Sequence, residues 1–221
     1  MGAETRKQFL SLCGRPLILH TLSVFECAKS IDGIVLVVPV EEEKLAVELV
    51  KEHRVKKVAR IVVGGKTRQD SVYCGLLATD ADADLVAVHD GVRPLVTEEI
   101  ISRTISRAKE LGAAIAAVPV SDTLKEASFD GCIKQTHDRM GFWLAQTPQV
   151  FRRGILMAAF EKAAAQNMVG TDEAFLVERL GYPVGLVEGS RENIKVTTPD
   201  DLQMAEYLLS KRNTRGRRIR K

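Results

Sequence analysis

Acidic and basic side chains stand directly after predicted strands in this sequence, where they could act on a phosphate group. In the stretch HDGVRP, Asp90 and Arg93 follow an apolar run. An aspartate at the end of a buried strand, with an arginine close behind it, can hold a hydrated Mg²⁺ beside a polyphosphate. A salt bridge between Asp90 and Arg93 that closes the loop is the alternative. We interpret His89 as a hydrogen-bonded strand-end side chain rather than as a ligand.

A second candidate is the turn GGKTRQDS at residues 64–71, which also follows an apolar run. Its two glycines would let the backbone approach a ligand closely, and the free N–H groups of the next helix suit an anion or the polar edge of a base. A plain strand-to-helix turn is the ordinary alternative. The turn is neither a Walker loop nor a G-x-G-x-x-G fingerprint, so ATPase and dinucleotide functions lack support.

Further polar side chains lie at the edges of predicted elements rather than on helix faces. They are Lys7, Thr123, Arg139, Thr147 and Lys195. Each has an ordinary structural explanation, because threonines cap helices and surface lysines are solvated. If the cations converge with Arg68 and Arg93, they form a positive pocket with Asp90 at its rim. Such a pocket suits phosphoryl chemistry, in which the protein acts by positioning and by stabilising charge.

The elements that must position these residues alternate along the first half of the chain. Apolar, largely β-branched runs predict buried strands at residues 34–39, 58–63, 85–89 and 112–119. Amphipathic stretches predict helices at residues 16–29, with proline at the first helical position, and at 41–53, 68–77 and 97–111. This alternation is typical of an α/β fold with a doubly wound, mostly parallel sheet. Ligands bind such sheets beyond the carboxyl ends of the strands.

The pattern changes between residues 121 and 149, where short strand-like pieces surround an Asp130-Gly131 turn. This predicts a β-arm that leaves the main sheet. Beyond it we expect helices at 153–166 and 171–180, the second capped by Thr171, strands at 185–189 and 193–197, and a last helix that starts at Thr198-Pro199. Residues 1–210 are therefore predicted to form a single domain with one arm.

Composition narrows the function further. The chain has 221 residues, 45% of them hydrophobic, without an apolar stretch long enough to span a membrane. Its four scattered cysteines indicate a reducing compartment and no zinc site. The net charge of +3 owes much to the final KRNTRGRRIRK. We expect residues 211–221 to be a disordered basic tail, as is common for chain termini of this composition. A nucleic-acid-binding arm is less favoured, because the tail lacks interleaved aromatic residues.

Seven motifs together resemble one enzyme family. In order they are KQFLSLCGRPLILHTL, GGKTRQDSVYCGL, HDGVRP, PVSDTLK, DRMGFWLAQTPQVF, TDEAFLVE and NIKVTTPDDL. This series, from Met1 to about Leu209, resembles the 2-C-methyl-D-erythritol 4-phosphate cytidylyltransferases of the non-mevalonate isoprenoid pathway. The resemblance implies a Rossmann-like nucleotidyltransferase fold and a homodimer built by the β-arm. It also implies Mg²⁺-dependent attack of methylerythritol phosphate on the α-phosphorus of CTP, which releases pyrophosphate without a covalent enzyme intermediate.

The resemblance also implies roles for individual residues. Lys7 would neutralise charge on the triphosphate in the transition state, and Arg139 and Lys195 would grip the attacking phosphate. The remaining matches are Asp90 near Mg²⁺ and the substrate hydroxyls, Gly65, Arg68 and Ser71 at cytosine and ribose, Thr147 beside Arg139, and Arg93 and Thr123 as secondary members of the pocket. If the arm is exchanged in the dimer, Arg139 and Thr147 would serve the neighbouring subunit's site.

The sequence departs from the family pattern in three places. Arg6 stands where the family usually has proline, and Val92 where it has a small residue. In the family, the stretch that matches MGAETRKQFL also follows a first strand and a glycine-rich loop with a transition-state arginine. We therefore hypothesise a fragment or a mis-started gene, with unpaired strand edges, weak stability and little activity if nothing precedes Met1. The upstream DNA would test this, since a stop codon without strand-loop coding sequence contradicts it.

Two alternative functions stay open at this point. A cytidylyltransferase for ribitol 5-phosphate or a similar pentitol phosphate would use much the same CTP site. An inactive truncated relative that only binds nucleotide or dimerises is the other, although Lys7, Arg139 and Lys195 together argue against a mere scaffold. The expected location is the bacterial cytoplasm, or a plastid if a transit peptide precedes this sequence.

Overall fold

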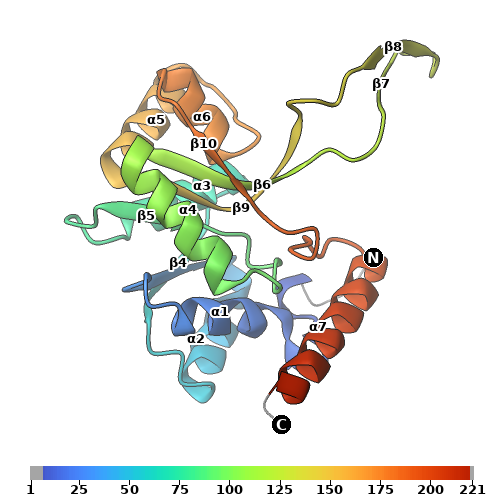
Figure 1. Cartoon of the computed structure of the whole chain (residues 1–221). Coiled ribbons are helices and arrows are strands. Elements are labelled where there is room, and N and C mark those ends of the chain that lie inside the picture. The colour runs from blue at the N-terminus through green and yellow to red at the C-terminus, as the bar shows by residue number, and fades with distance from the viewer. Residues whose placement is uncertain (1–6, 220–221) are drawn as a thin grey trace.

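The computed structural model describes residues 7–219, with side chains described from residue 8 to residue 212. It has an α/β architecture with a mixed central sheet (Figure 1). The strands of this sheet, in the order β10-β6-β9-β5, are β10 (Gly185–Glu188), β6 (Ala113–Pro119), β9 (Trp143–Arg152) and β5 (Leu85–Val88). β10 runs parallel to β6, whereas β9 is antiparallel to both of its neighbours. The α/β prediction is confirmed, with a sheet that is mixed.

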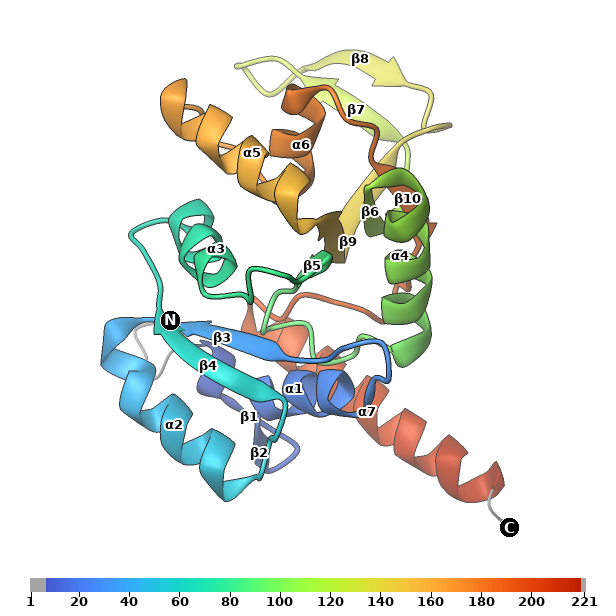
Figure 2. The same cartoon turned by 90° about the vertical axis from the view of Figure 1, so that its left-hand side faces the viewer.

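A second, two-stranded sheet consists of β3 (Ile34–Val38) and β4 (Val58–Val63), which run parallel (Figure 2). Within residues 7–219, β3 pairs with β4 alone and β5 with β9 alone. Each of these two strands therefore has one edge without a partner strand among the described residues. A short antiparallel pair, β1 (Ser11–Leu12) and β2 (Arg15–Pro16), precedes the first helix.

The helices fall close to their predicted ranges. They are α1 (Leu17–Cys27), α2 (Glu43–Glu52), α3 (Arg68–Leu77), α4 (Glu98–Leu111), α5 (Arg153–Ala165), α6 (Glu173–Leu180) and α7 (Pro199–Ile219), with 3₁₀ turns η1 (Lys7–Phe9) and η2 (Val40–Glu42). Thr97 caps α4 by accepting a hydrogen bond from the Ile100 N–H. The helix ends at Gly112, whose φ of 92° is a conformation that glycine adopts without strain.

Several local predictions are wrong. Pro16 is the N-cap of α1 and not its first helical residue. Asp172 rather than Thr171 caps α6, because its carboxylate accepts the Phe175 N–H at 2.9 Å. Residues 193–197 form no strand. Helix α7 runs on to Ile219, so the segment that begins at residue 211 continues a helix where we expected a disordered tail.

The core lies on both faces of the four-stranded sheet. Along β6, Ala114 and Ala116 face α4 and α1, while Ala113 and Ile115 face α5 and α6. Figure 2 shows α4 on one side of this sheet and α5 and α6 on the other. Because successive strand residues point to opposite faces, a strand covered on both sides reads as a continuous apolar run. Each large apolar side chain buried in this way contributes about 1.5–3 kcal/mol.

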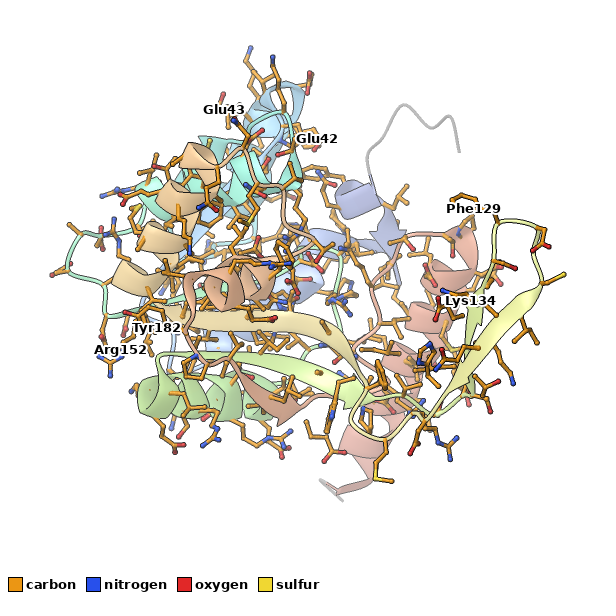
Figure 3. The ribbon with its side chains drawn as sticks, turned by 90° about the horizontal axis from the view of Figure 1, so that it is seen from above. Glu42, Glu43, Phe129, Lys134, Arg152 and Tyr182 are labelled. Atoms are coloured by element: carbon orange, nitrogen blue, oxygen red, sulfur yellow. The ribbon has the colours of Figure 1, made fainter. Side chains whose placement is uncertain are left out.

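The β-arm is present where the sequence predicted it. It consists of β7 (Leu124–Ala127) and β8 (Ile133–His137), which pair antiparallel. The arm projects from the body (Figure 1), with Phe129 at its tip (Figure 3). Figure 3 also shows Phe129 and Lys134 on the arm, at the opposite end of the molecule from Arg152 and Tyr182. The arm therefore makes few contacts with the body of its own chain.

Among the described residues, none of the helices combines the length and the apolar composition that crossing a membrane requires.

Candidate active site

Asp90 is the centre of the candidate site. It lies two residues beyond the end of β5, and three cations contact its carboxylate. Lys195 Nζ and Arg93 Nε lie 3.1 and 3.2 Å from Oδ2, and Arg68 Nε lies 3.5 Å from Oδ1. Burial alone would raise the pKa of Asp90, but the charges of Lys195 and Arg68 outweigh it and hold this pKa below its ordinary value. The predicted convergence of Arg68, Arg93 and Lys195 on Asp90 is therefore observed.

Two of these cations remain open to solvent. The side chains of Lys195 and Arg68 are 40% and 39% exposed, whereas that of Arg93 is only 12% exposed. Lys195 and Arg68 can thus meet a bound anion without a change of fold. Arg93 instead donates from Nη1 to the Asn193 carbonyl at 2.8 Å, so it organises the loop beneath the cluster.

Arg68 also connects Asp90 to helix α6. Its Nη1 and Nη2 donate to the two carboxylate oxygens of Glu173 at 2.7 and 3.0 Å. Burial raises the pKa of Glu173, and the hydrogen bonds and charge of Arg68 act against that rise. Sequence analysis did not single out Glu173. Its place in the motif TDEAFLVE was the one available signal.

The glycine turn folds tightly against the start of α3. A Cβ on Gly64 would lie 2.6 Å from Ser71 Oγ, and a Cβ on Gly65 would lie 2.3 Å from Asp70 Cβ. Both positions are therefore restricted to glycine by the first turn of this helix. Thr67 caps the helix in a reciprocal capping box with Asp70, and Ser71 Oγ donates to the Thr67 carbonyl at 2.8 Å. The two glycines are thus explained by the packing of the turn against α3. The turn also leads directly into Arg68, which contacts Asp90.

Thr147 fixes the backbone of Asp90 from the neighbouring strand β9. Its Oγ1 accepts the Asp90 N–H at 3.1 Å and lies 3.0 Å from His89 Nδ1. Burial lowers the pKa of His89 to about 4, so the ring is neutral at pH 7. Nδ1 then accepts the threonine proton while Nε2 faces the Arg93 carbonyl at 3.3 Å. Thr147 is 3% exposed and contacts Asp90 of its own chain, and its expected place in a neighbouring subunit's site stays a prediction.

Asn193 and Gln146 hold the segment that carries Lys195. Asn193 Nδ2 donates to the Thr147 carbonyl at 2.9 Å and to Gln146 Oε1 at 3.2 Å, and Asn193 is fully buried. The Val196 N–H donates to the Val92 carbonyl at 2.9 Å. These contacts place residues 193–196 beside the HDGVRP loop. Sequence reasoning did not identify Gln146 or Asn193, because nothing in the local pattern shows that the two meet.

The remaining predicted residues lie elsewhere. Arg139 and Thr123 are exposed at the base of the β-arm, where Arg139 donates to the Ser121 carbonyl. Neither contacts Asp90, Arg68, Arg93 or Lys195 among the described side chains. Lys7 opens η1, but its side chain lies outside the described residues. Its predicted role, like that of Arg139 and Thr123, stays a prediction.

The donor set at Asp90 fits a divalent cation that brings its other ligands with it. Among residues with described side chains, no group of three or more His, Cys, Asp and Glu residues could hold a metal ion. The Asp90 side chain is 11% exposed and lies beside two exposed cations, and Mg²⁺ in nucleotide sites binds through one or two carboxylates, water and substrate phosphates. Asp90 is the residue that would hold such an ion.

Comparison with known proteins gives one family. The sequence model of the family described as 2-C-methyl-D-erythritol 4-phosphate cytidylyltransferase matches residues 1–211. The protein of that name from Pelotomaculum thermopropionicum is 48% identical over 216 residues, which cover 97% of this chain and 91% of the relative. The one from Syntrophus aciditrophicus is also 48% identical, with 97% and 92% covered.

Solved structures agree. The crystal structure of 4-diphosphocytidyl-2C-methyl-D-erythritol synthase from Anaerococcus prevotii superposes with a TM-score of 0.85 at 32% identity, covering 92% of this chain and 93% of that one. The structure of 2-C-methyl-D-erythritol 4-phosphate cytidylyltransferase from Thermus thermophilus gives a TM-score of 0.78 at 35% identity, with 91% and 92% covered.

Proposed function

Because this chain belongs to the family of 2-C-methyl-D-erythritol 4-phosphate cytidylyltransferases, we propose that its reaction takes place over the Asp90 cluster, defined as Asp90, Arg68, Arg93 and Lys195. The enzyme transfers a cytidylyl group from CTP to 2-C-methyl-D-erythritol 4-phosphate and releases pyrophosphate. The family match favours this acceptor over ribitol 5-phosphate. The observation that supports this location of the active site is the convergence of three cations on one carboxylate just beyond β5.

The charges of this cluster suit the substrates. CTP and the acceptor phosphate are both anionic, and they repel one another unless cations lie between them. Lys195 and Arg68 are the exposed cations, and each is tied to Asp90 and so is directed before substrate arrives. A phosphate oxygen of the acceptor attacks the α-phosphorus of CTP, and the bond to the pyrophosphate oxygen breaks. Cations placed in advance act most on the charge that builds in the transition state.

Each residue has a proposed role in this reaction. Lys195 directs the acceptor phosphate, and Lys7 neutralises the triphosphate. The turn of Gly65 and Ser71 faces the nucleoside beside Arg68. Asp90 would hold Mg²⁺, which when bound offsets charge on the triphosphate oxygens. Arg93 and Thr147 keep the Asp90 loop in shape, as their hydrogen bonds indicate.

We also propose that the β-arm pairs two copies of the chain. The arm and its base expose several large apolar side chains, namely Phe129, Ile133, Met140, Phe142 and Trp143. Such a surface favours a protein partner, and most soluble oligomers are symmetric homo-oligomers. Arg139 lies at the base of the arm and away from its own Asp90, which favours a role in the partner's site, with Thr123 beside it.

A bacterial cytoplasmic location is proposed on the ground that the relatives are bacterial proteins.

The placement of the reaction is tested by Asp90→Asn, with Asp82→Asn as the matched control. Asp82 is an exposed carboxylate outside the proposed site. We expect Asp90→Asn to lower kcat/KM by about 10²–10³ and to raise the Mg²⁺ concentration needed for half-maximal rate, because the carboxylate charge is lost. Pyrophosphate release from CTP with methylerythritol phosphate measures both. A near-normal rate in Asp90→Asn, or an equal loss in Asp82→Asn, would place the reaction elsewhere.

A further inference from the structure

Helix α7 lies against the two chain segments that build the Asp90 cluster. Its apolar side chains Leu202, Leu208 and Leu209 pack with Ala205 onto Leu95 and Val196, which belong to those segments. One segment is the loop of residues 89–95, which follows β5. The other comprises residues 192–196, which lead into α7. The helix therefore contacts the outer side of the site while remaining outside it.

Arg212 continues the buried face of α7 by one further turn. Ala205, Leu208 and Arg212 follow the three- and four-residue spacing that puts side chains on one side of a helix. At this position the apolar stripe gives way to a guanidinium group, which has several fixed donors rather than a hydrocarbon end. The side chain of Arg212 is 30% exposed, so most of it lies within the protein.

The guanidinium group binds both segments at once. Its Nη1 donates to the Leu95 carbonyl at 2.9 Å. Its Nε donates to Glu192 Oε2 at 3.1 Å, and Nη2 lies 3.0 Å from the same oxygen. Leu95 is two residues beyond Arg93, and Glu192 is three residues before Lys195. Arg212 thus connects the end of one site segment to the start of the other.

The two segments otherwise meet through few hydrogen bonds. The Val196 N–H donates to the Val92 carbonyl at 2.9 Å, and Arg93 Nη1 donates to the Asn193 carbonyl at 2.8 Å. Residues 193–197 form no strand, so no regular ladder fixes their register. Lys195 reaches Asp90 only if this irregular segment keeps its place.

From these contacts we propose that Arg212 is a positioning residue of the transfer reaction. It fixes residues 192–195 against residues 93–95, and so it sets Lys195 Nζ on Asp90 and on the acceptor phosphate. The proposal rests on the proposed role of Lys195. A planar guanidinium group can bind a carbonyl and a carboxylate at the same time, and lysine cannot reproduce that geometry. Because a shift of about 1 Å in a reactive group costs roughly 10²-fold in rate, a contact made far from phosphorus can matter.

The test uses Arg212→Gln and Glu192→Gln, with Lys211→Ala as the control. Lys211 is the exposed cation next to Arg212 on the same helix. We expect each glutamine variant to lower kcat/KM for methylerythritol phosphate by about tenfold to hundredfold, while KM for CTP changes less than about twofold, because only Lys195 is displaced. The double variant should lose little more than either single variant, since both remove one connection. Arg212→Lys should restore only part of the loss.

Stability serves as the second readout. A partly exposed ion pair adds little to the free energy of unfolding, so Tm should change little in all variants. Wild-type kinetics in Arg212→Gln, or a loss that Lys211→Ala shares, overturns the proposal. If Arg212→Gln melts early, Glu192→Gln decides, because it keeps the bond to Leu95. Full activity in Lys195→Ala would instead overturn the proposed role of Lys195 in the reaction, on which the proposal for Arg212 rests.

Discussion

The side chains around Asp90 divide into those that meet the substrate and those that support them. Lys195 and Arg68 are exposed, while Thr147 and Asn193 are buried and His89 is half-buried. Buried polar groups are costly without a partner, so the hydrogen bonds of Thr147, His89 and Asn193 Nδ2 hold the site in place, while Asn193 Oδ1 is buried without a hydrogen-bond partner among the described residues.

The hydroxyl of Thr147 gives a prediction at the scale of single residues. Thr147→Val keeps the shape but leaves the Asp90 N–H and His89 Nδ1 without their shared partner. The expected loss is about 1–3 kcal/mol in the free energy of unfolding, measured by denaturant titration, together with a lower kcat/KM. Thr147→Ser retains the hydroxyl group and should behave nearly as wild type. Equal behaviour of the two variants would mean that the hydroxyl group does not hold Asp90.

At this scale the sequence predicted the charged residues of the site and missed their partners. Asp90, Arg68 and Lys195 stand out because a charge directly beside an apolar run needs an explanation. Gln146 and Asn193 do not stand out, because amides are common in loops. Only the fold shows that the two are buried against each other.

The start of helix α7 gives a prediction at the scale of elements. Asp201 Oδ2 accepts hydrogen bonds from the Thr197 N–H, the Thr198 N–H and the Thr197 hydroxyl, each at 2.8 Å. These bonds lower the pKa of Asp201 from 3.8 to about 2. A carboxyl group with a lowered pKa stabilises the fold above its unfolded pKa, and this contribution disappears as the pH falls through the folded pKa.

Asp201→Ala should therefore destabilise the chain at pH 7 by about 0.5–1 kcal/mol, toward the low end because the group is solvated. The difference from wild type should shrink as the pH falls from about 4 to about 2. Urea titrations across this range measure it. Asp200→Ala removes the neighbouring exposed acid and serves as the control. If the difference in free energy of unfolding between wild type and Asp201→Ala does not change with pH, the charge of the Asp201 carboxylate does not stabilise the start of α7.

Helices and strands were predictable where apolar residues form a continuous run or recur at helical spacing. The strands at β3, β4 and β6 and the helix at α3 fall at or within a residue of their expected ranges. The first residues of β9 are predicted as part of the arm, because they belong to the short strand-like pieces around Asp130-Gly131, yet the second half of β9 lies between β5 and β6. Pairing between distant segments has no local signature. Residues 193–197 look like a strand but bind a loop instead.

At the scale of the whole molecule, the arm predicts that two copies share each site. Arg139→Ala and Lys195→Ala should each be nearly inactive. Arg139 is proposed to act in the active site of the partner subunit, whereas Lys195 is proposed to act in the active site of its own chain. When the two are mixed and allowed to exchange, half of the dimers carry one intact site, so about a quarter of wild-type activity should return. Pyrophosphate release from the mixture measures this. No recovery in a mixture shown to contain heterodimers would mean that Arg139 acts in its own chain.

The open edges of β3 and β5 bear on how the protein behaves in concentrated solution. Each strand offers a row of backbone N–H and C=O groups without a partner strand within residues 7–219. Such rows are templates for pairing with other chains, and natural proteins usually cover or charge them. The apolar residues of β3, IVLVV, have high β propensity and no charge of their own. We therefore expect the edges of β3 and β5 to favour association between chains at high concentration, quite apart from the arm through which we expect the protein to assemble.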